Sequence, residues 1–320
     1  MPAGRDGSQR IGSVSVIVPT LRRPESLSRA IMSLAAQTEL DGRHLEILVV
    51  DNAPEGGADA VCAGLPMPDG TTLKVIPEPR MGVATARNAG LAAATGGIIG
   101  FLDDDCTAPP DWLATRLACL EETGADALFG PRHALLERRP ETDAAWFEDA
   151  FTQDLKVASG TPVADRCDYL PLTGSLVRRV ALGDRLRFDP RLDRTGGEDI
   201  LLFKALREAG ARMIWCDAAP VVEHVPEARL DPAYVLKRRY VSGQIRCLVP
   251  SLLDPPGRRE IAAQMVKGAA QVALAGPLAL AGRMARGRWP ARLTTVALSG
   301  LGKLTWWRTG PHFYGDGHVG

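Results

Sequence analysis

Short apolar runs alternate with helical segments through the first hundred residues, and this alternation limits the fold more than any other feature. Aliphatic and β-branched residues predominate at positions 14–18, 45–50, 73–76 and 98–102. Segments with helical periodicity or high alanine content lie between these runs. Strands that are apolar on both faces and alternate with helices are typical of a parallel sheet covered on both sides. The sequence therefore predicts an α/β fold.

Polar residues follow three of these runs directly. The first run ends in Pro19-Thr20, the second in Asp51 and the last in Asp103-Asp104-Asp105. Ligands of open parallel sheets bind outside the carboxyl ends of the strands, so we expect these residues to converge on one edge. The first run is followed by Pro-Thr-Leu-Arg-Arg, whereas a dinucleotide-binding fold needs Gly-x-Gly-x-x-Gly there; a P-loop motif is also absent.

Three adjacent carboxylates after a buried strand repel one another unless a cation or several donors neutralise them. Asp103, Asp104 and Asp105 have no neighbouring His or Cys pair that would favour a softer metal, and carboxylates suit Mg²⁺ or Mn²⁺. The alternative is a solvated acidic loop that precedes a helix starting near Pro109-Pro110-Asp111-Trp112. From the residues alone, both interpretations stay open.

The composition excludes some classes of function. Lys and Arg together number 38, as do Asp and Glu, so no net charge attracts the chain to nucleic acid. Six scattered cysteines show no zinc spacing and indicate reduced thiols in a cytosolic protein. Residues 1–12 are polar and lack the apolar core of a signal peptide, so we expect a disordered lead-in.

Five motifs, in order, resemble family 2 glycosyltransferases with a GT-A fold. They are Val-Ser-Val-Ile-Val-Pro-Thr, Ile-Leu-Val-Val-Asp-Asn, Gly-Val-Ala-Thr-Ala-Arg-Asn-Ala-Gly, Phe-Leu-Asp-Asp-Asp and Gly-Gly-Glu-Asp-Ile-Leu-Leu, within residues 14–225. The resemblance implies a mostly parallel, Rossmann-like sheet with helices on both faces. It also implies an inverting transferase that uses a nucleotide-diphosphate sugar, UDP-linked in our expectation, and a divalent metal. The segment around Cys167-Asp168-Tyr169 and the tail look like bacterial exopolysaccharide members.

The resemblance also implies a domain organisation. We expect a GT-A catalytic domain over 13–228, with a nucleotide-sugar half at 13–105 and an acceptor half at 106–228. A helical C-terminal extension would occupy 229–320.

The resemblance assigns roles at the donor site. Pro19 and Thr20 would border the nucleoside, and Asp51 would accept a hydrogen bond from the base, although a strand-ending proline and a turn aspartate are the structural alternatives. The Arg87 guanidinium would reach the diphosphate. Asp105 would bind the metal. The remaining members of the donor set are Arg22, Asp103 and Asp104.

A second pair of acids begins another helix in Gly196-Gly197-Glu198-Asp199. Acids there also complement a helix dipole without any catalytic role. By resemblance, Asp199 would deprotonate the acceptor hydroxyl and Glu198 would orient the acceptor.

The remaining candidates concern the acceptor and the metal. Trp112 would stack on an acceptor sugar, with core packing as the alternative. Gly174 and Ser175 resemble the acceptor loop of the family, although an Asn is common where Ser175 stands. His224 is a candidate second metal ligand, and a structural histidine is the alternative.

The C-terminal region changes in composition. Its longest uncharged stretch, 268–282, is broken by Pro277 and is shorter than the roughly 20 residues that span a bilayer, so we expect no crossing. Apolar helices flanked by arginines and followed by Trp306-Trp307 suit the surface of an anionic membrane; a helical cap or a dimer contact is the alternative.

The sequence thus predicts an inverting glycosyltransferase at the cytoplasmic face of the cell membrane that acts on a glycan or lipid-linked acceptor in cell-surface polysaccharide synthesis. A nucleotidyltransferase, or a non-catalytic carbohydrate-binding or scaffold protein that retains the fold, is the alternative.

Overall fold

The computed structural model describes residues 12–183, 187–287 and 289–309. Except for Gly12, the expected lead-in at 1–12 lies outside these residues. The chain forms two compact units, each taken by itself below. The first comprises residues up to 134, 152–190 and 202–224, and the second comprises 135–151, 191–201 and the residues from 225 onward.

The first unit contains a seven-stranded sheet with the order β3-β2-β1-β4-β8-β6-β9. Strand β8 alone is antiparallel to its neighbours, so the sheet is mostly parallel, as predicted. Its strands are β1 (Ser13–Thr20), β2 (His44–Asp51), β3 (Thr71–Pro77), β4 (Ile98–Phe101), β6 (Ala127–Phe129), β8 (Leu176–Arg178) and β9 (Met213–Trp215).

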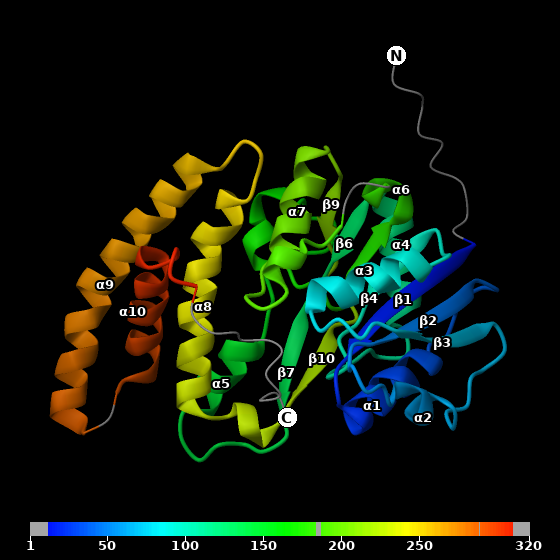
Figure 1. The fold of residues 1–320 in the computed structure, drawn as a ribbon, viewed down its shortest axis with the longest axis horizontal. Coiled ribbons are helices and arrows are strands. Elements are labelled where there is room, and N and C mark those ends of the chain that lie inside the picture. Colours follow the sequence, from blue (N-terminus) through cyan, green and yellow to red (C-terminus); the bar gives the residue numbers. More distant parts are fainter. Residues whose placement is uncertain (1–11, 184–186, 288, 310–320) are drawn as a thin grey trace. The chain divides into compact units, whose positions relative to one another are not determined.

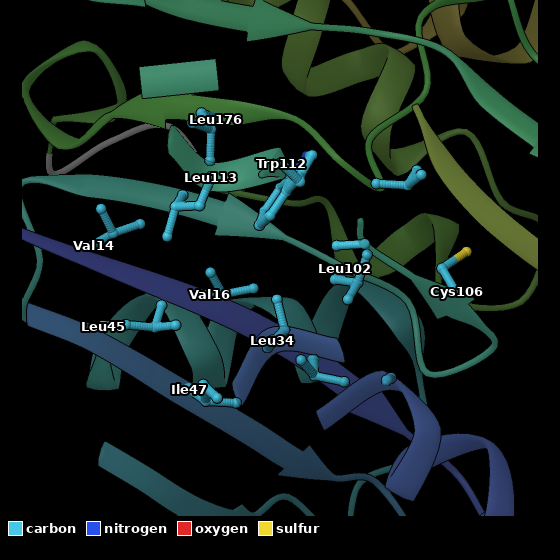
Figure 2. Packing of buried hydrophobic residues seen from close by; sticks show 14 of the residues in the cluster. Val14, Val16, Leu34, Leu45, Ile47, Leu102, Cys106, Trp112, Leu113 and Leu176 are labelled. Atoms are coloured by element: carbon cyan, nitrogen blue, oxygen red, sulfur yellow. The ribbon is translucent and has the colours of Figure 1, made fainter. Parts of the chain in front are cut away.

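Helices cover both faces of this sheet because alternate strand residues point to opposite sides. One face packs on α1 (Pro24–Ala35) and α4 (Trp112–Thr123), and the other packs on α3 (Val83–Ala93) and on the part of α7 (Glu198–Glu208) that belongs to this unit. Figure 2 shows the first face, where Val16 of β1 lies near Leu34 of α1. The shorter elements of this unit are α2 (Ala58–Cys62), α6 (Arg179–Leu182) and the 3-10 turn Ala164–Tyr169.

A small second sheet has the order β5-β10-β7, with β5 at Cys106–Thr107, β10 at Val221–Val225 and β7 at Arg132–Leu136. Strand β5 directly follows the acid triplet, and Glu223 of β10 pairs antiparallel with Cys106. The three acids therefore lie in a short turn between β4 of the large sheet and β5 of the small one.

The second unit is helical. It contains α5 (Ala144–Phe151), α8 (Pro232–Ser251), α9 (Arg258–Arg286) and α10 (Ala291–Leu304), with 3-10 turns at Pro190–Leu192 and Glu227–Arg229. Figure 1 shows α8, α9 and α10 side by side. Glycines allow this close packing: a Cβ on Gly302 would lie 2.1 Å from the Tyr240 carbonyl oxygen, and one on Gly300 would lie 2.7 Å from the Gly268 carbonyl oxygen. Helix α5 is tied to α10 by the Trp146 indole, which donates to Thr295 Oγ1 at 3.0 Å.

Helix α9 differs from the sequence expectation. Pro277 does not interrupt it: the helix runs for 29 residues, with Pro277 on an exposed side. Within the described part of the chain, Arg258–Ala285 is long and apolar enough to cross a membrane, by length and composition only. Length and composition do not distinguish a spanning helix from one that lies on a surface, so the expected absence of a crossing stays a prediction.

Candidate active site

The carboxyl ends of three parallel strands meet at one edge of the large sheet, as the sequence predicts. Thr20 at the end of β1 is in register with Asp51 at the end of β2, and Ile17 of β1 is in register with Phe101 of β4. The Thr20 hydroxyl donates to Asp104 Oδ2 at 2.8 Å. The polar ends of β1 and β4 therefore contact each other directly.

Two arginines neutralise the acid triplet. Arg87 Nη2 donates to Asp103 Oδ1 at 2.9 Å. Arg23 Nη1 lies 3.1 Å from Asp104 Oδ1 and 3.3 Å from Asp105 Oδ2. These two guanidinium groups together contact all three carboxylates.

The pKa of Asp104 is shifted by its surroundings, chiefly by burial. Burial, together with the neighbouring Asp105 and Asp103 carboxylates, raises the pKa of Asp104 to about 6, although the Arg23 guanidinium and the Thr20 hydroxyl act in the opposite direction. Burial and the neighbouring carboxylates thus favour the protonated form of Asp104 more than solvent would.

Arg87 is held on two sides. It is a buried residue of α3, and its guanidinium carbon lies 5.7 Å from the centre of the Phe188 ring. Asn88 fixes Phe188 by two reciprocal bonds, donating to the Phe188 carbonyl at 2.8 Å and accepting from its N–H at 3.0 Å. The arginine predicted to bind diphosphate is thus positioned beside the acids.

Arg22 and Arg23 are adjacent but have different surroundings. Arg22 is exposed and pairs with Glu55, its Nη2 lying 2.9 Å from Glu55 Oε2. Arg23, at the start of α1, contacts the acids instead. Nothing in Pro-Thr-Leu-Arg-Arg distinguishes the two arginines, because their difference depends on the backbone turn: Arg22 has a φ of 56°.

The other predicted nucleoside residues lie at the same edge. Asp51 is buried, and its Oδ1 and Oδ2 accept from the Ala53 and Ala58 N–H groups at 3.2 and 2.8 Å. This is the turn role that its position at a strand end also allowed. Pro19 is half-buried at the end of β1. Their contacts with a base stay predictions.

Gly174 and Ser175, predicted to bind the acceptor, support the acid segment. Gly174 N–H donates to the Phe101 carbonyl at 2.7 Å, and Phe101 N–H donates to the Ser175 carbonyl at 3.2 Å. The preceding Thr173 hydroxyl accepts from Asp103 N–H at 2.9 Å. Ser175 is fully buried, which leaves its side chain no surface for an acceptor. We therefore correct its role to supporting the strand that carries the triplet.

Trp112 also needs correction. Its side chain is completely buried in the core beneath the sheet, where it is the first residue of α4. A sugar stacks only on an exposed ring face, so the packing alternative accounts for Trp112. A solvent-facing aromatic cannot be told from a core aromatic by sequence position after two prolines.

His224 approaches the triplet through its backbone. Its N–H donates to the Asp105 carbonyl at 2.8 Å, and its Nε2 lies 3.0 Å from Thr107 Oγ1. Among the described residues, no group of three or more His, Cys, Asp or Glu side chains is arranged to hold a metal ion. The predicted Asp105 and His224 ligand pair is therefore not preassembled as part of a larger cluster.

A buried ion pair that the sequence analysis leaves unassigned supports the same turn. Arg132 Nε lies 3.2 Å from Glu223 Oε2, and both side chains are buried. Burial lowers the pKa of Arg132, but Glu223, Cys106, Asp103 and Asp105 together raise it above its usual value. This ion pair fixes β7 to β10, and β10 in turn pairs with the strand that follows the triplet through Glu223 and Cys106.

The second pair of acids begins α7, as predicted, and belongs to the second unit. Glu198 is buried, whereas Asp199 is half-buried. Gly197 has a φ of 94°, and a Cβ there would lie 2.7 Å from Ile245 Cγ2 of α8. Only glycine tolerates both the positive φ and the close approach of Ile245. Packing therefore explains the glycine before these acids, in addition to the predicted functional role.

Comparison with known proteins identifies the family. Residues 15–170 match the family model described as Glycosyl transferase family 2. The succinoglycan biosynthesis protein ExoM of Rhizobium meliloti is 34% identical over 235 residues, which cover 72% of this chain and 73% of ExoM. The chain belongs to glycosyltransferase family 2. This family 2 glycosyltransferase is also 29% identical to glycosyltransferase AglE of Haloferax volcanii over 117 residues, 37% of this chain and 38% of AglE.

Solved structures confirm the fold. The structure of residues 1–349 of S. aureus TarS in complex with UDP-GlcNAc matches with a TM-score of 0.55 and 16% identity, covering 94% of this chain and 93% of that chain. The same TarS segment in complex with UDP matches with a TM-score of 0.54 and 15% identity, covering 93% of this chain and 92% of that chain. The predicted GT-A fold with a helical C-terminal region is confirmed.

Proposed function

We propose that this glycosyltransferase transfers a sugar, with inversion, from a UDP-linked donor to a hydroxyl of a glycan or lipid-linked acceptor in cell-surface polysaccharide synthesis. The single observation that carries the proposal is the sheet edge where Asp103, Asp104 and Asp105 face Arg87 and Arg23. ExoM, named for succinoglycan biosynthesis, supports the product class, and the UDP-GlcNAc complex of TarS supports the donor class.

The donor would lie along this edge. Arg87 offers a fork of N–H donors that suits diphosphate oxygens, and its contact with Phe188 keeps it in place. Pro19, Thr20, Arg22 and Asp51 would border the nucleoside, and Asp103 and Asp104 the ribose or sugar.

The acids fit the divalent metal that the family implies. Their oxygens are hard donors, and the carboxylates of Asp104 and Asp105 lie close enough together to contact the same nitrogen of Arg23. Asp105 would hold the ion, with His224 as the candidate second ligand. Bound Mn²⁺ or Mg²⁺ would supply electrostatic stabilisation of the departing diphosphate.

The transfer itself needs a base. Asp199 would accept the proton of the acceptor hydroxyl, whose oxygen attacks the anomeric carbon on the side opposite the diphosphate. The bond from this carbon to the acceptor oxygen forms as its bond to the diphosphate breaks, and the electron pair leaves with the diphosphate. Arg87 would donate to the diphosphate as its charge grows. Glu198 would orient the acceptor.

Membrane contact is a further part of the proposal. Nine of the fourteen large apolar side chains that are exposed in the described chain lie in the second unit from Val266 to Trp307. Between residues 261 and 309 the sequence contains seven Lys and Arg residues and no Asp or Glu. An apolar, positively charged surface suits the anionic, cytoplasmic face of the cell membrane, where a lipid-linked acceptor would lie.

The test is a transfer assay on the full chain with a panel of UDP-sugars and GDP-sugars, Mn²⁺ and lipid-phosphate acceptors. The proposal predicts Mn²⁺-dependent release of UDP from one sugar donor, accelerated by an acceptor, and a product of inverted anomeric configuration. Retention of configuration would contradict the single displacement. Release of pyrophosphate in a parallel assay with UTP and a sugar 1-phosphate would favour the nucleotidyltransferase alternative. Failure of every donor to react would favour the non-catalytic alternative.

A further inference from the structure

Arg23 contacts two acids with a single nitrogen. Its Nη1 donates to Asp104 Oδ1 at 3.1 Å and to Asp105 Oδ2 at 3.3 Å. The backbone of Arg23 is fixed at the start of α1, where its carbonyl accepts from Leu27 N–H at 2.9 Å. One monovalent cation thus lies between two carboxylates, one of which is the proposed metal ligand.

A divalent ion and this guanidinium would compete for the same oxygens. Asp104 Oδ2 already accepts from the Thr20 hydroxyl. Its Oδ1 faces Arg23 and is therefore the Asp104 oxygen that a metal ion beside Asp105 would approach. A metal ion that approached Asp105 would meet the positive charge of Arg23 within a few ångströms, where repulsion in a partly buried site is strong. Either the guanidinium moves or the metal binds weakly.

The Arg23 side chain is more exposed to solvent than the Arg87 side chain. Its side chain is 20% exposed, whereas that of Arg87 is 8% exposed and lies against Phe188. A nucleotide diphosphate would bring several negative oxygens to this edge, and a guanidinium binds phosphate as readily as carboxylate. Arg23 can therefore exchange its carboxylate partners for phosphate partners without leaving the site.

We propose that Arg23 is a displaceable counter-ion that makes metal binding depend on the nucleotide. In the free enzyme it pairs with Asp104 and Asp105; when a diphosphate arrives, Arg23 turns to the phosphate and leaves Asp105 open to the metal. This inference rests on the proposed donor site. By thermodynamic reciprocity, the factor by which nucleotide tightens metal binding equals the factor by which metal tightens nucleotide binding.

The experiment measures free Mn²⁺ by electron paramagnetic resonance during titration of the full chain at pH 8, with and without UDP. Wild type is compared with Arg23→Gln and with Arg29→Gln, a variant of equal charge change at an exposed position of α1. We expect Arg23→Gln to bind Mn²⁺ alone about tenfold more tightly than wild type, because no guanidinium has to be displaced. The tightening by UDP should fall by a similar factor. Arg29→Gln should match wild type in both measurements, since Arg29 donates to Ser26 Oγ on its own helix and contacts none of the three acids in the hydrogen bonds that the structure shows.

Equal Mn²⁺ affinities in all three proteins, or weaker binding by Arg23→Gln, would overturn the role of Arg23 while leaving the donor site intact, provided that UDP still tightens Mn²⁺ binding. If no protein binds Mn²⁺ even with UDP, the metal part of the proposed function fails, and the inference fails with it. A fold control comes from Tm: Mn²⁺ should raise the Tm of Arg23→Gln more than that of wild type. Should Arg23→Gln not fold, Arg23→Lys, whose ammonium cannot fork, should bind Mn²⁺ about threefold more tightly than wild type, and equal affinity would overturn the inference.

Discussion

At the scale of single residues, Asp103, Asp104 and Asp105 show how adjacent carboxylates coexist at a strand end. Each carboxylate has a cationic or hydroxyl partner. Asp103 contacts Arg87, Asp104 contacts Arg23 and Thr20, and Asp105 contacts Arg23 as well. Sequence alone predicts that some cation must be present there. It does not predict which one, because the partners come from two other segments of the chain.

Replacement of the proposed base is the most direct residue-level prediction. Asp199→Asn keeps the size of the side chain but removes its ability to accept a proton. We expect transfer to fall by at least about 100-fold while the Kd for UDP with Mn²⁺ changes less than about twofold. Glu208→Gln, at the exposed far end of the same helix, is the matched control and should keep its activity. Near-normal turnover of Asp199→Asn would remove Asp199 from the mechanism.

At the scale of elements, one buried acid connects several strands. Glu46 of β2 accepts from Ser15 of β1 at 2.5 Å, from Lys74 of β3 at 2.8 Å and from the Thr95 N–H and hydroxyl, each at 2.9 Å. Burial by itself would raise the pKa of Glu46, but these bonds outweigh it and lower the pKa from 4.5 to about 2. The ionised form therefore stabilises the first half of the sheet.

The lowered pKa of Glu46 determines how the stability of the fold changes with pH. Because the folded pKa lies below the unfolded one, the stabilisation is complete above about pH 5 and is lost as the pH falls toward 2. The free energy of unfolding of wild type should exceed that of Glu46→Gln at pH 7, and the difference should shrink by about 1 kcal/mol between pH 7 and pH 4. Urea unfolding at both values measures it. A difference that stays constant or grows in acid would contradict this account of the sheet.

The elements divide into those that the sequence predicts well and those that it does not. The buried strands β1, β2 and β4 were predictable because apolar side chains on both faces leave little else for such runs to form. The antiparallel β8 was not, since its three residues carry no periodicity of their own and depend on pairing with β4 and β6. Helix α9 continues through Pro277, which lies on its exposed side, although proline disfavours a helix interior.

At the scale of the whole molecule, the two compact units are not contiguous in sequence. Residues 135–151 and 191–201 belong to the second unit with the C-terminal helices, although the sequence places them inside the expected 13–228 domain. Such an arrangement depends on long-range contacts that no local pattern encodes. The predicted boundary at 228 stays a prediction.

A single substitution that adds one negative charge tests the membrane proposal at this scale. Leu274 on α9 is 71% exposed, and Leu274→Glu removes apolar area and adds repulsion from anionic lipid. In flotation with vesicles containing anionic phospholipid, we expect the recovered fraction of the full-length variant to fall about tenfold. Val180→Glu, at an 83% exposed site in the first unit, is the control and should float like wild type. Equal recovery of all three proteins would exclude this face as the contact.

The measurement that tests the central claim most directly is calorimetric titration of the full chain with UDP and with GDP, each in Mn²⁺ and in EDTA, with Asp105→Ala alongside. We predict that UDP binds in Mn²⁺ and that EDTA or Asp105→Ala weakens binding by at least about tenfold, because the carboxylate, the metal and the diphosphate act together. Binding of neither nucleotide by the folded protein, or equal affinity for UDP in Mn²⁺ and in EDTA, would contradict a metal-assisted donor site at the acid triplet.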